Sequence, residues 1–138
     1  MEFGWKPEYS VGVPTFDEHH RHFFELAGGM ISQAKAPEVD CETLLERITY
    51  LGDYVMYHMA EEEKYFAVYG YPDASAHIAA HDVFRGQVRE YLKQAESCPL
   101  GGRLIAVELA EFSTHWLVQH IMEVDKKYTE FFKDKEVK

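Results

Sequence analysis

The sequence has few cysteines and fewer basic than acidic residues. The first shortage argues against disulfide and cysteine metal frameworks, and the second argues against binding to polyanions. Its two cysteines, Cys41 and Cys98, form no CxxC pair, so we expect free thiols rather than a disulfide framework or a cysteine zinc site. The 14 Lys and Arg are outnumbered by 24 Asp and Glu, which gives a formal net charge of -10. Nucleic acids and anionic membrane surfaces bind basic patches, so neither is expected as a partner.

Segments that lead a chain into or across a membrane are also missing from the sequence. No long uncharged apolar run occurs, and the first residues, Met1 to Pro7, lack the basic and apolar regions of a secretory signal. We therefore expect a cytoplasmic protein. At 138 residues, 46% of them hydrophobic, the chain has the length of one domain and enough apolar side chains for a core.

Proline, glycine and capping residues divide the chain into an N-terminal arm and four helices. Thr15 and Glu18 have the spacing of a capping box, which predicts that the first helix starts at Thr15 and runs to about Ala36. The other predicted helices run from an N-cap at Asp40 to Gly70, from Asp73 or Ser75 to about Ser97, and from Arg103 into the 120s or early 130s.

Four helices joined by short loops favour an all-α fold, an up-down-up-down antiparallel four-helix bundle. We expect a single domain over residues 1–138. Its parts are an extended N-terminal arm at 1–14, the bundle at 15–133 and a frayed charged tail at 134–138.

The apolar stripe of each predicted helix includes histidine, at steps of three and four residues. The four expected stripes are Phe16, His20, Phe23, Ala27, Met30 and Ala34; Leu44, Ile48, Leu51, Val55, His58, Glu62, Tyr65 and Tyr69; His77, His81, Phe84, Val88, Tyr91 and Ala95; and Ile105, Leu109, Phe112, Trp116, His120 and Val124.

A lone histidine on an apolar stripe is usually a hydrogen-bonded core residue, but five of them together with carboxylates need another explanation. The stripes hold no Lys or Arg, so a bound cation is the charge that would neutralise buried carboxylates. The sequence therefore predicts a buried metal site whose ligands are His20, His58, Glu62, His77, His81, His120 and Asp125.

The other three histidines fall off the stripes. His22 and His115 lie on polar faces and are expected in solvent. His19 lies on a flank of the first helix, where we expect a surface residue, with a place behind the metal ligands as the alternative.

The donor set decides which metal is expected. The histidines are too many for one tetrahedral zinc, no HExxH motif is present, and calcium and magnesium prefer oxygen ligands. A histidine-rich dinuclear iron centre bridged by carboxylates fits best. His120 and Asp125 diverge by about 140° on an ideal helix, so we expect either a bridging geometry or a local helix distortion there.

Several motifs together resemble the hemerythrin family, specifically its bacterial single-domain members, over residues 5–128. They are Trp5, Val11-Gly12-Val13, Asp17 to Arg21, His58 with Glu62-Glu63, Tyr71-Pro72 before His77, His81 and Phe84, and Trp116-Leu117 before His120, Asp125 and Tyr128. At three positions where the family commonly has Gln, Phe and Met, this chain has His19, Met59 and Phe66.

The resemblance implies a cofactor of two iron ions with an oxo or hydroxo bridge. It places His77, His81 and His120 on one iron, His20 and His58 on the other, and Glu62 and Asp125 across both. These donors fall one short of two octahedral irons, and the vacancy lies on the iron with two histidines. The implied function is reversible dioxygen binding for storage, delivery or sensing by a monomer that is not an enzyme, with nitric oxide or peroxide as further ligands.

One alternative is a redox enzyme of peroxidase or nitric oxide reductase type on the same di-iron site, which would need a proton donor such as Tyr54, one turn from His58. A signalling module that acts through a partner protein is another. By helical spacing from the proposed ligands, the expected walls of the ligand pocket are Phe23, Phe24, Leu51, Tyr54, Phe84, Trp116 and Leu117.

Overall fold

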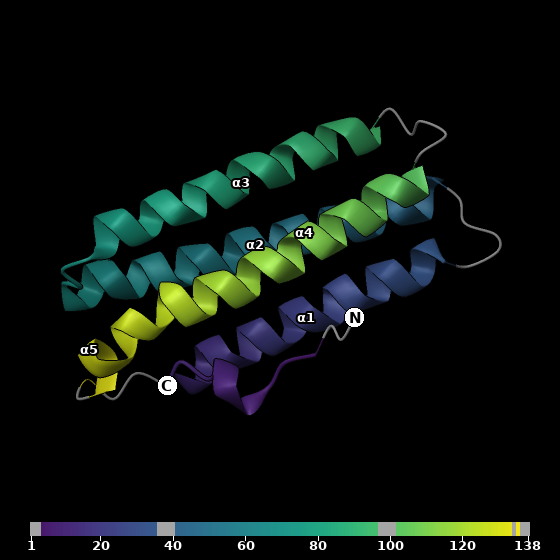
Figure 1. Cartoon of the computed structure of the whole chain (residues 1–138). Coiled ribbons are helices and arrows are strands. Elements are labelled where there is room, and N and C mark those ends of the chain that lie inside the picture. Colours follow the sequence, from purple (N-terminus) through teal and green to yellow (C-terminus); the bar gives the residue numbers. More distant parts are fainter. Residues whose placement is uncertain (1–3, 36–40, 97–101, 134, 136–138) are drawn as a thin grey trace.

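The structure is a computed structural model that describes residues 4–35, 41–96, 102–133 and 135. Its long helices are α1 (Pro14–Ala34), α2 (Cys41–Tyr69), α3 (Ala74–Glu96) and α4 (Gly102–Glu123), and its short elements are η1 (Pro7–Tyr9), η2 (Asp125–Tyr128) and α5 (Thr129–Lys133). The long helices lie side by side and successive ones run in opposite directions (Figure 1). This arrangement confirms the predicted all-α, up-down-up-down antiparallel four-helix bundle.

The N-terminal arm is fixed to the start of α1 by Asp17, and the predicted N-cap at Thr15 is wrong because the helix begins one residue earlier. Helix α1 begins at Pro14, after an N-cap at Val13 that makes no side-chain hydrogen bond. The Asp17 carboxylate instead accepts hydrogen bonds from the Ser10 hydroxyl at 2.6 Å and from the Val11 amide at 2.8 Å. A proline suits the first helical position because the amide it lacks would have no intrahelical partner.

Helix α2 ends at Tyr69, and the predicted end, Gly70, is the residue that follows it. This glycine has a φ of 69°, which a residue with a side chain rarely adopts. The Tyr71 amide donates to the Phe66 carbonyl at 2.9 Å, and the two rings pack 5.0 Å apart between centroids. These features make up a Schellman motif with its hydrophobic contact.

Helix α4 stops at Glu123, and the chain continues as the separate turn η2. Val124 has φ -115° and ψ -56°, so Asp125 begins a 3-10 turn rather than a further α-helical turn. The local distortion expected between His120 and Asp125 is therefore present, and it removes the divergence that an ideal helix would impose on the two side chains.

The buried faces agree with the stripes predicted for α1, but not fully with the others. On α2, Phe66 takes the place expected for Tyr65 and Tyr69, because its ring packs against Tyr128 and Phe132 while 37% of Tyr69 is exposed. On α3, the predicted Tyr91 is only partly buried.

Helix α4 departs further from its predicted stripe. Phe112, Trp116 and Val124 are only partly buried, whereas residues on the adjacent face are fully inside. Because α4 packs against α1, α2 and α3, its buried face is wider than a single stripe. The buried residues outside the predicted stripe are Ala106, Ala110, Ser113, Thr114, Leu117 and Ile121.

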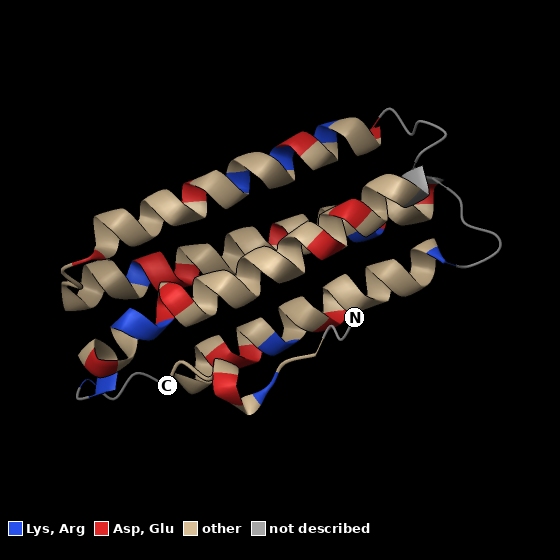
Figure 2. Cartoon of the chain, viewed as in Figure 1, with Lys and Arg blue, Asp and Glu red and all other residues tan. Residues whose placement is uncertain are grey.

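Charged residues of both signs are interspersed along the long helices (Figure 2). Among the described helices, none combines the length and apolar content that a bilayer crossing requires.

Some predictions fall on residues whose placement is not described. The N-cap at Asp40, the helix end near Ser97 and the thiol of Cys98 lie outside the described residues, and only the helical backbone is described for Cys41. The predicted tail, 134–138, also lies outside them apart from Lys135.

Candidate metal centre

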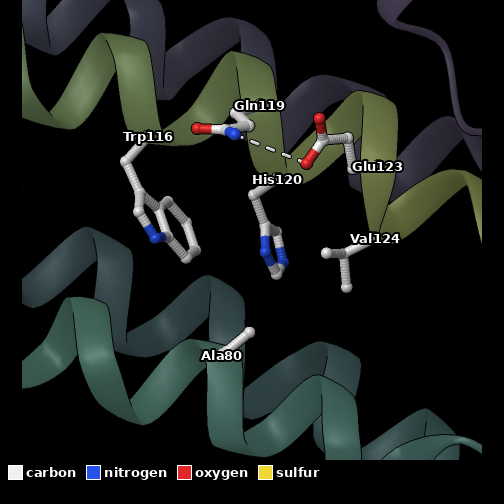
Figure 3. A pocket seen from close by; sticks show the side chains of 6 residues that line it. All are labelled: Ala80, Trp116, Gln119, His120, Glu123 and Val124. Atoms are coloured by element: carbon white, nitrogen blue, oxygen red, sulfur yellow. Dashed lines mark hydrogen bonds between the residues drawn. The ribbon is translucent and has the colours of Figure 1, made fainter.

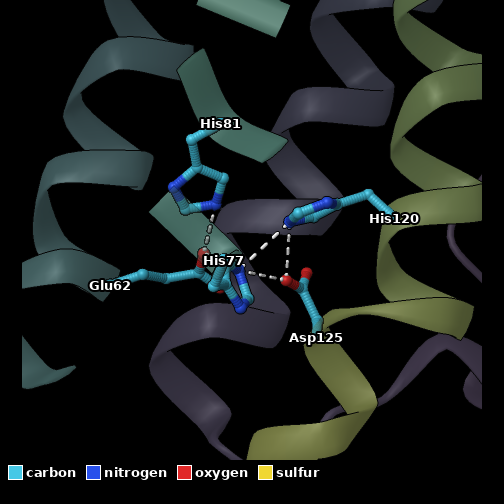
Figure 4. Close-up of side chains that lie close together, drawn as sticks. All are labelled: Glu62, His77, His81, His120 and Asp125. Carbon is cyan, nitrogen blue, oxygen red and sulfur yellow. Dashed lines mark hydrogen bonds and ion pairs between the residues drawn. The ribbon is translucent and has the colours of Figure 1, made fainter. Parts of the chain in front are cut away.

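The seven side chains predicted as ligands come together in the interior of the bundle, toward the end where α1 and α3 begin. In the larger group, Glu62, His77, His81, His120 and Asp125 bring potential ligand atoms within 4.8 Å of one another (Figure 4). In a second group His20 and His58 share Glu62 at the same spacing, and every member of both groups is buried. These side chains come from all four long helices and from η2.

The Glu62 carboxylate lies between the two groups of histidines. Its Oε1 is 3.1 Å from Nε2 of His81 and 3.5 Å from Nε2 of His77. Its Oε2 is 3.5 Å from Nε2 of His58. We call the side of His77, His81 and His120 the three-histidine side and that of His20 and His58 the two-histidine side. One oxygen of Glu62 therefore faces the three-histidine side, and the other faces the two-histidine side.

Asp125 divides its oxygens in the same way. Its Oδ1 lies 2.9 Å from Nε2 of His120 and 3.0 Å from Nε2 of His77, and its Oδ2 lies 3.3 Å from Nε2 of His20. Two carboxylates that each present one oxygen to each side have the geometry of bridging ligands for a metal pair.

The centre also leaves buried polar atoms without hydrogen-bond partners among the described residues. These atoms are both ring nitrogens of His20, Nδ1 of His77, Oε1 of Glu62 and both oxygens of Asp125. In addition, the Nε2 atoms of His77 and His120 lie only 3.1 Å apart. Unpaired buried polar atoms are costly, and cations between these donors would satisfy most of them, so the residues present fit a metal pair.

Opposed electrostatic effects act on the two carboxylates. Burial and the charge of Asp125 raise the pKa of Glu62, but the imidazoles that face the carboxylate, first His58 and then His77 and His81, outweigh them and hold this pKa well below its usual range. Burial likewise raises the pKa of Asp125, and its histidine neighbours, foremost His120, hold that pKa well below normal. Both side chains are therefore ionised, as metal ligands must be.

The histidines on the two sides differ in how they hold protons. Burial lowers the pKa of His58 to about 3, so its imidazole is neutral. Burial also lowers the pKa of His77, but the adjacent carboxylates of Asp125 and Glu62 more than reverse this and raise it to about 9. Without a metal, the three-histidine side therefore holds a proton that a metal would replace.

The ligand candidate His81 is held from behind by a charged pair that the sequence analysis missed. Its Nδ1 lies 2.7 Å from Oε2 of Glu63, and the same oxygen accepts a hydrogen bond from Arg85 at 2.7 Å. The four-residue spacing of His81 and Arg85 places them on one face of α3, but it does not identify Glu63 on α2 as their shared partner.

Tyr128 is a second residue whose role the sequence analysis missed. Its hydroxyl donates to Oε2 of Glu62 at 2.6 Å, and its ring stacks on His77 with centroids 5.7 Å apart. Burial, followed by the nearby carboxylates, raises the pKa of Tyr128 well above its usual value, so the phenol keeps its proton.

The expectation that His19 is a surface residue is wrong. Only 8% of His19 is exposed, and its Nδ1 lies 2.8 Å from Nδ1 of His58. The flank of α1 that carries it packs against α2, where its ring meets Tyr57 edge-on. His19 therefore occupies the alternative position, directly behind the ligand candidate His58.

The other two histidines are outside the centre, as predicted. His115 is exposed on α4. His22 is partly exposed and lies 3.6 Å from the Glu25 carboxylate.

The expected pocket walls divide into buried and outer residues. Phe23, Phe24, Leu51, Phe84 and Leu117 are each at most 2% exposed. Trp116 and Tyr54 are partly buried; Trp116 stacks on His120, and Tyr54 packs on His22. Burial, followed by the charges of its neighbours, raises the pKa of Tyr54 to about 12.

Beside His120 a cavity of about 160 Å³ opens between α3 and α4. His120 lies between Trp116 and Val124 in its wall, opposite Ala80 (Figure 3). The three-histidine side is therefore the side that adjoins this cavity.

Comparisons with known proteins agree with this geometry. A sequence model described as the hemerythrin HHE cation binding domain matches residues 11–132. A bacteriohemerythrin of Clostridium acetobutylicum is 30% identical over 91% of this chain and 98% of its own length, and one of Stenotrophomonas maltophilia is 28% identical over 91% and 78%.

Solved structures agree with the sequence comparisons. A crystal structure of wild-type hemerythrin superposes with a TM-score of 0.81 at 27% identity, over 91% of this chain and 94% of that one.

Proposed function

Because the chain belongs to the hemerythrin family, we propose that it is a non-haem di-iron protein that binds dioxygen reversibly, for storage, delivery or sensing. In this proposal His77, His81 and His120 hold one iron, and His20 and His58 hold the other. Glu62 and Asp125 would each offer one oxygen to each iron.

The observation that carries the proposal is the unequal division of the histidines. Three imidazoles lie on one side of the two carboxylates and two on the other. With both carboxylates shared, the iron held by His20 and His58 would have one protein ligand fewer than the other iron, which would leave it a position for an external ligand. An open position on a metal is where a small external ligand binds.

When bound, the iron pair would supply the electrons that a dioxygen ligand takes up. The contribution of the protein is to keep that position dry. Phe23 and Phe24 follow His20 by three and four residues, and Val55 precedes His58 by three; all three are buried. An apolar lining withholds the water and protons that would expel a charged ligand.

The nearby phenols hold their protons firmly, which favours dioxygen binding over peroxidase or nitric oxide reductase activity. A peroxidase or nitric oxide reductase would need a group that gives up a proton at the open position. The hydroxyl of Tyr128 is engaged with Glu62, and its pKa is well above its usual value. The Tyr54 ring packs on His22 and meets His19 edge-on, neither of which is a proposed ligand, and burial raises its pKa to about 12.

The test of the proposal is an oxygenation cycle. Iron-loaded protein is reduced without air, exposed to oxygen and then evacuated while its visible spectrum is recorded. We expect an absorption band that appears with oxygen, disappears under vacuum and returns over several cycles. Irreversible oxidation accompanied by catalytic consumption of hydrogen peroxide or nitric oxide would instead support the enzyme.

A further inference from the structure

The two sides of the centre differ in the group that contacts Nδ1 of a proposed ligand histidine. On the two-histidine side, His58 directs Nε2 toward Glu62 and leaves Nδ1 beside His19 at 2.8 Å. On the three-histidine side, Nδ1 of His81 faces the carboxylate of Glu63 at 2.7 Å. The inference drawn from this difference rests on the proposed di-iron function.

The contact between His19 and His58 fixes the tautomer of both rings. An imidazole that binds a metal through Nε2 carries its proton on Nδ1. Nδ1 of His58 therefore donates, and Nδ1 of His19 accepts. An imidazole whose Nδ1 accepts a hydrogen bond is uncharged and has its own proton on Nε2.

The ring of His19 is held in place from several directions. It meets Tyr57 at 5.3 Å and Tyr54 at 6.1 Å between centroids, both edge-on, and Phe16 lies 6.1 Å away on another side. A ring confined in this way keeps its acceptor nitrogen directed at His58.

Acceptors of different charge act differently on the metal beyond the histidine. A carboxylate acceptor makes the ligand imidazole more basic, and a more basic ligand favours the ferric ion. Glu63 acts in this sense on His81, tempered by its pairing with Arg85. The neutral imidazole of His19 increases the basicity of His58 much less. The ferrous ion is therefore relatively favoured on the two-histidine side, which has the open position.

We propose that His19 is a positioning residue for the two-histidine metal. It orients the Nε2 lone pair of His58 toward that metal. Because it is a neutral acceptor, it also keeps the reduction potential of this metal higher than a carboxylate in the same position would.

Three substitutions of His19 separate orientation from charge. His19→Gln keeps a neutral acceptor, His19→Glu supplies an anionic one, and His19→Leu supplies none. His115→Leu, at an exposed histidine, is the matched control. Each protein is loaded with iron, its metal affinities are measured by competition with a chelator, and its reduction potentials are measured by anaerobic redox titration.

We expect His19→Leu to lower the affinity of the protein for one of the two metals by about 10-fold to 100-fold. This is the usual effect of removing the hydrogen-bond partner of a metal ligand. His19→Gln should restore that affinity. His19→Glu should retain the metal but lower one reduction potential, by about 59 mV for each tenfold change in the one-electron equilibrium. His115→Leu should match the wild type in both measurements.

Wild-type affinity for both metals in His19→Leu would overturn the orienting role. Equal potentials in His19→Gln and His19→Glu would overturn the charge effect, and this pair decides it even when the leucine variant fails to fold. A wild-type protein that binds no metal pair would instead refute the proposed function, so the two failures are distinguishable.

Discussion

Tyr128 donates a 2.6 Å hydrogen bond to Oε2 of Glu62, the carboxylate oxygen that faces His58. This contact joins the turn η2 to the C-terminal third of α2, across 66 positions of sequence. It orients one of the two proposed bridging carboxylates from outside the set of proposed ligands.

Replacement of Tyr128 by phenylalanine should destabilise the metal-free protein by about 1–3 kcal/mol, because a buried carboxylate oxygen loses its donor while the ring stays. The free energy of unfolding, from urea titration followed by circular dichroism, checks this. Tyr50→Phe, at a residue that is 55% exposed, is the control and should change little. Equal stabilities of the two variants would contradict the role given to the hydrogen bond.

Loss of a proposed ligand should remove metal from one side first. We expect His58→Ala to reduce the iron content from two to about one per chain, because only one imidazole then remains on that side. His115→Ala should keep the wild-type content, since this residue is exposed on α4. Iron analysis of the purified proteins measures both, and an equal loss from the two variants would refute the ligand assignment.

Metal binding should release a proton from His77 at neutral pH. The pKa of His77 in the metal-free protein is raised to about 9, so at pH 7 the ring is protonated and a metal must displace the proton. His58, with its pKa lowered to about 3, has none to release. Calorimetry of Zn²⁺ binding in buffers of different ionisation enthalpy counts the protons, and we expect release at pH 7 that vanishes above pH 9.

The same shift predicts how the stability of the metal-free protein depends on pH. The folded pKa of His77 lies above its ordinary value of 6.5, so its contribution is complete below pH 6.5 and is lost as the pH rises through about 9. The depressed pKa of His58 acts oppositely, and stability falls as the pH drops from 6.5 toward 3. Melting temperatures across this range should therefore decline in both directions, and a flat profile would exclude both effects.

Two glycines should respond in opposite ways to alanine. Gly86 lies within α3 with open space around its Cβ position, so Gly86→Ala should stabilise by about 1 kcal/mol through helix propensity. Gly70 also has open space but a φ of 69°, so Gly70→Ala should destabilise by about 1–2 kcal/mol. Urea unfolding measures both, and changes of the same sign would show that backbone conformation does not decide the effect.

The monomeric state and the cytoplasmic location stay predictions. Sedimentation of the purified protein and fractionation of cells that express it would test them.

Much of the fold followed from local sequence signals. The glycine at position 70 and the apolar spacing on α1 predicted features that the structure contains, because they depend on backbone geometry within a few residues. The predicted N-cap at Thr15 failed because α1 already begins at Pro14, after Val13. The Asp17 contacts with the arm involve residues that precede the helix, which helix periodicity does not describe.

The sequence by itself determined the inward face of the helices for six of the seven clustered side chains, because three- and four-residue spacing fixes the face on which a residue lies. Asp125 joins them only through the turn η2 that follows α4. The tertiary structure decided which residues contact the proposed ligands on the side away from the metal. His19 is buried because α2 covers its flank, and Glu63 reaches His81 because α2 and α3 lie side by side. Periodicity describes one helix at a time, whereas these contacts depend on which helix lies next to it and at what height.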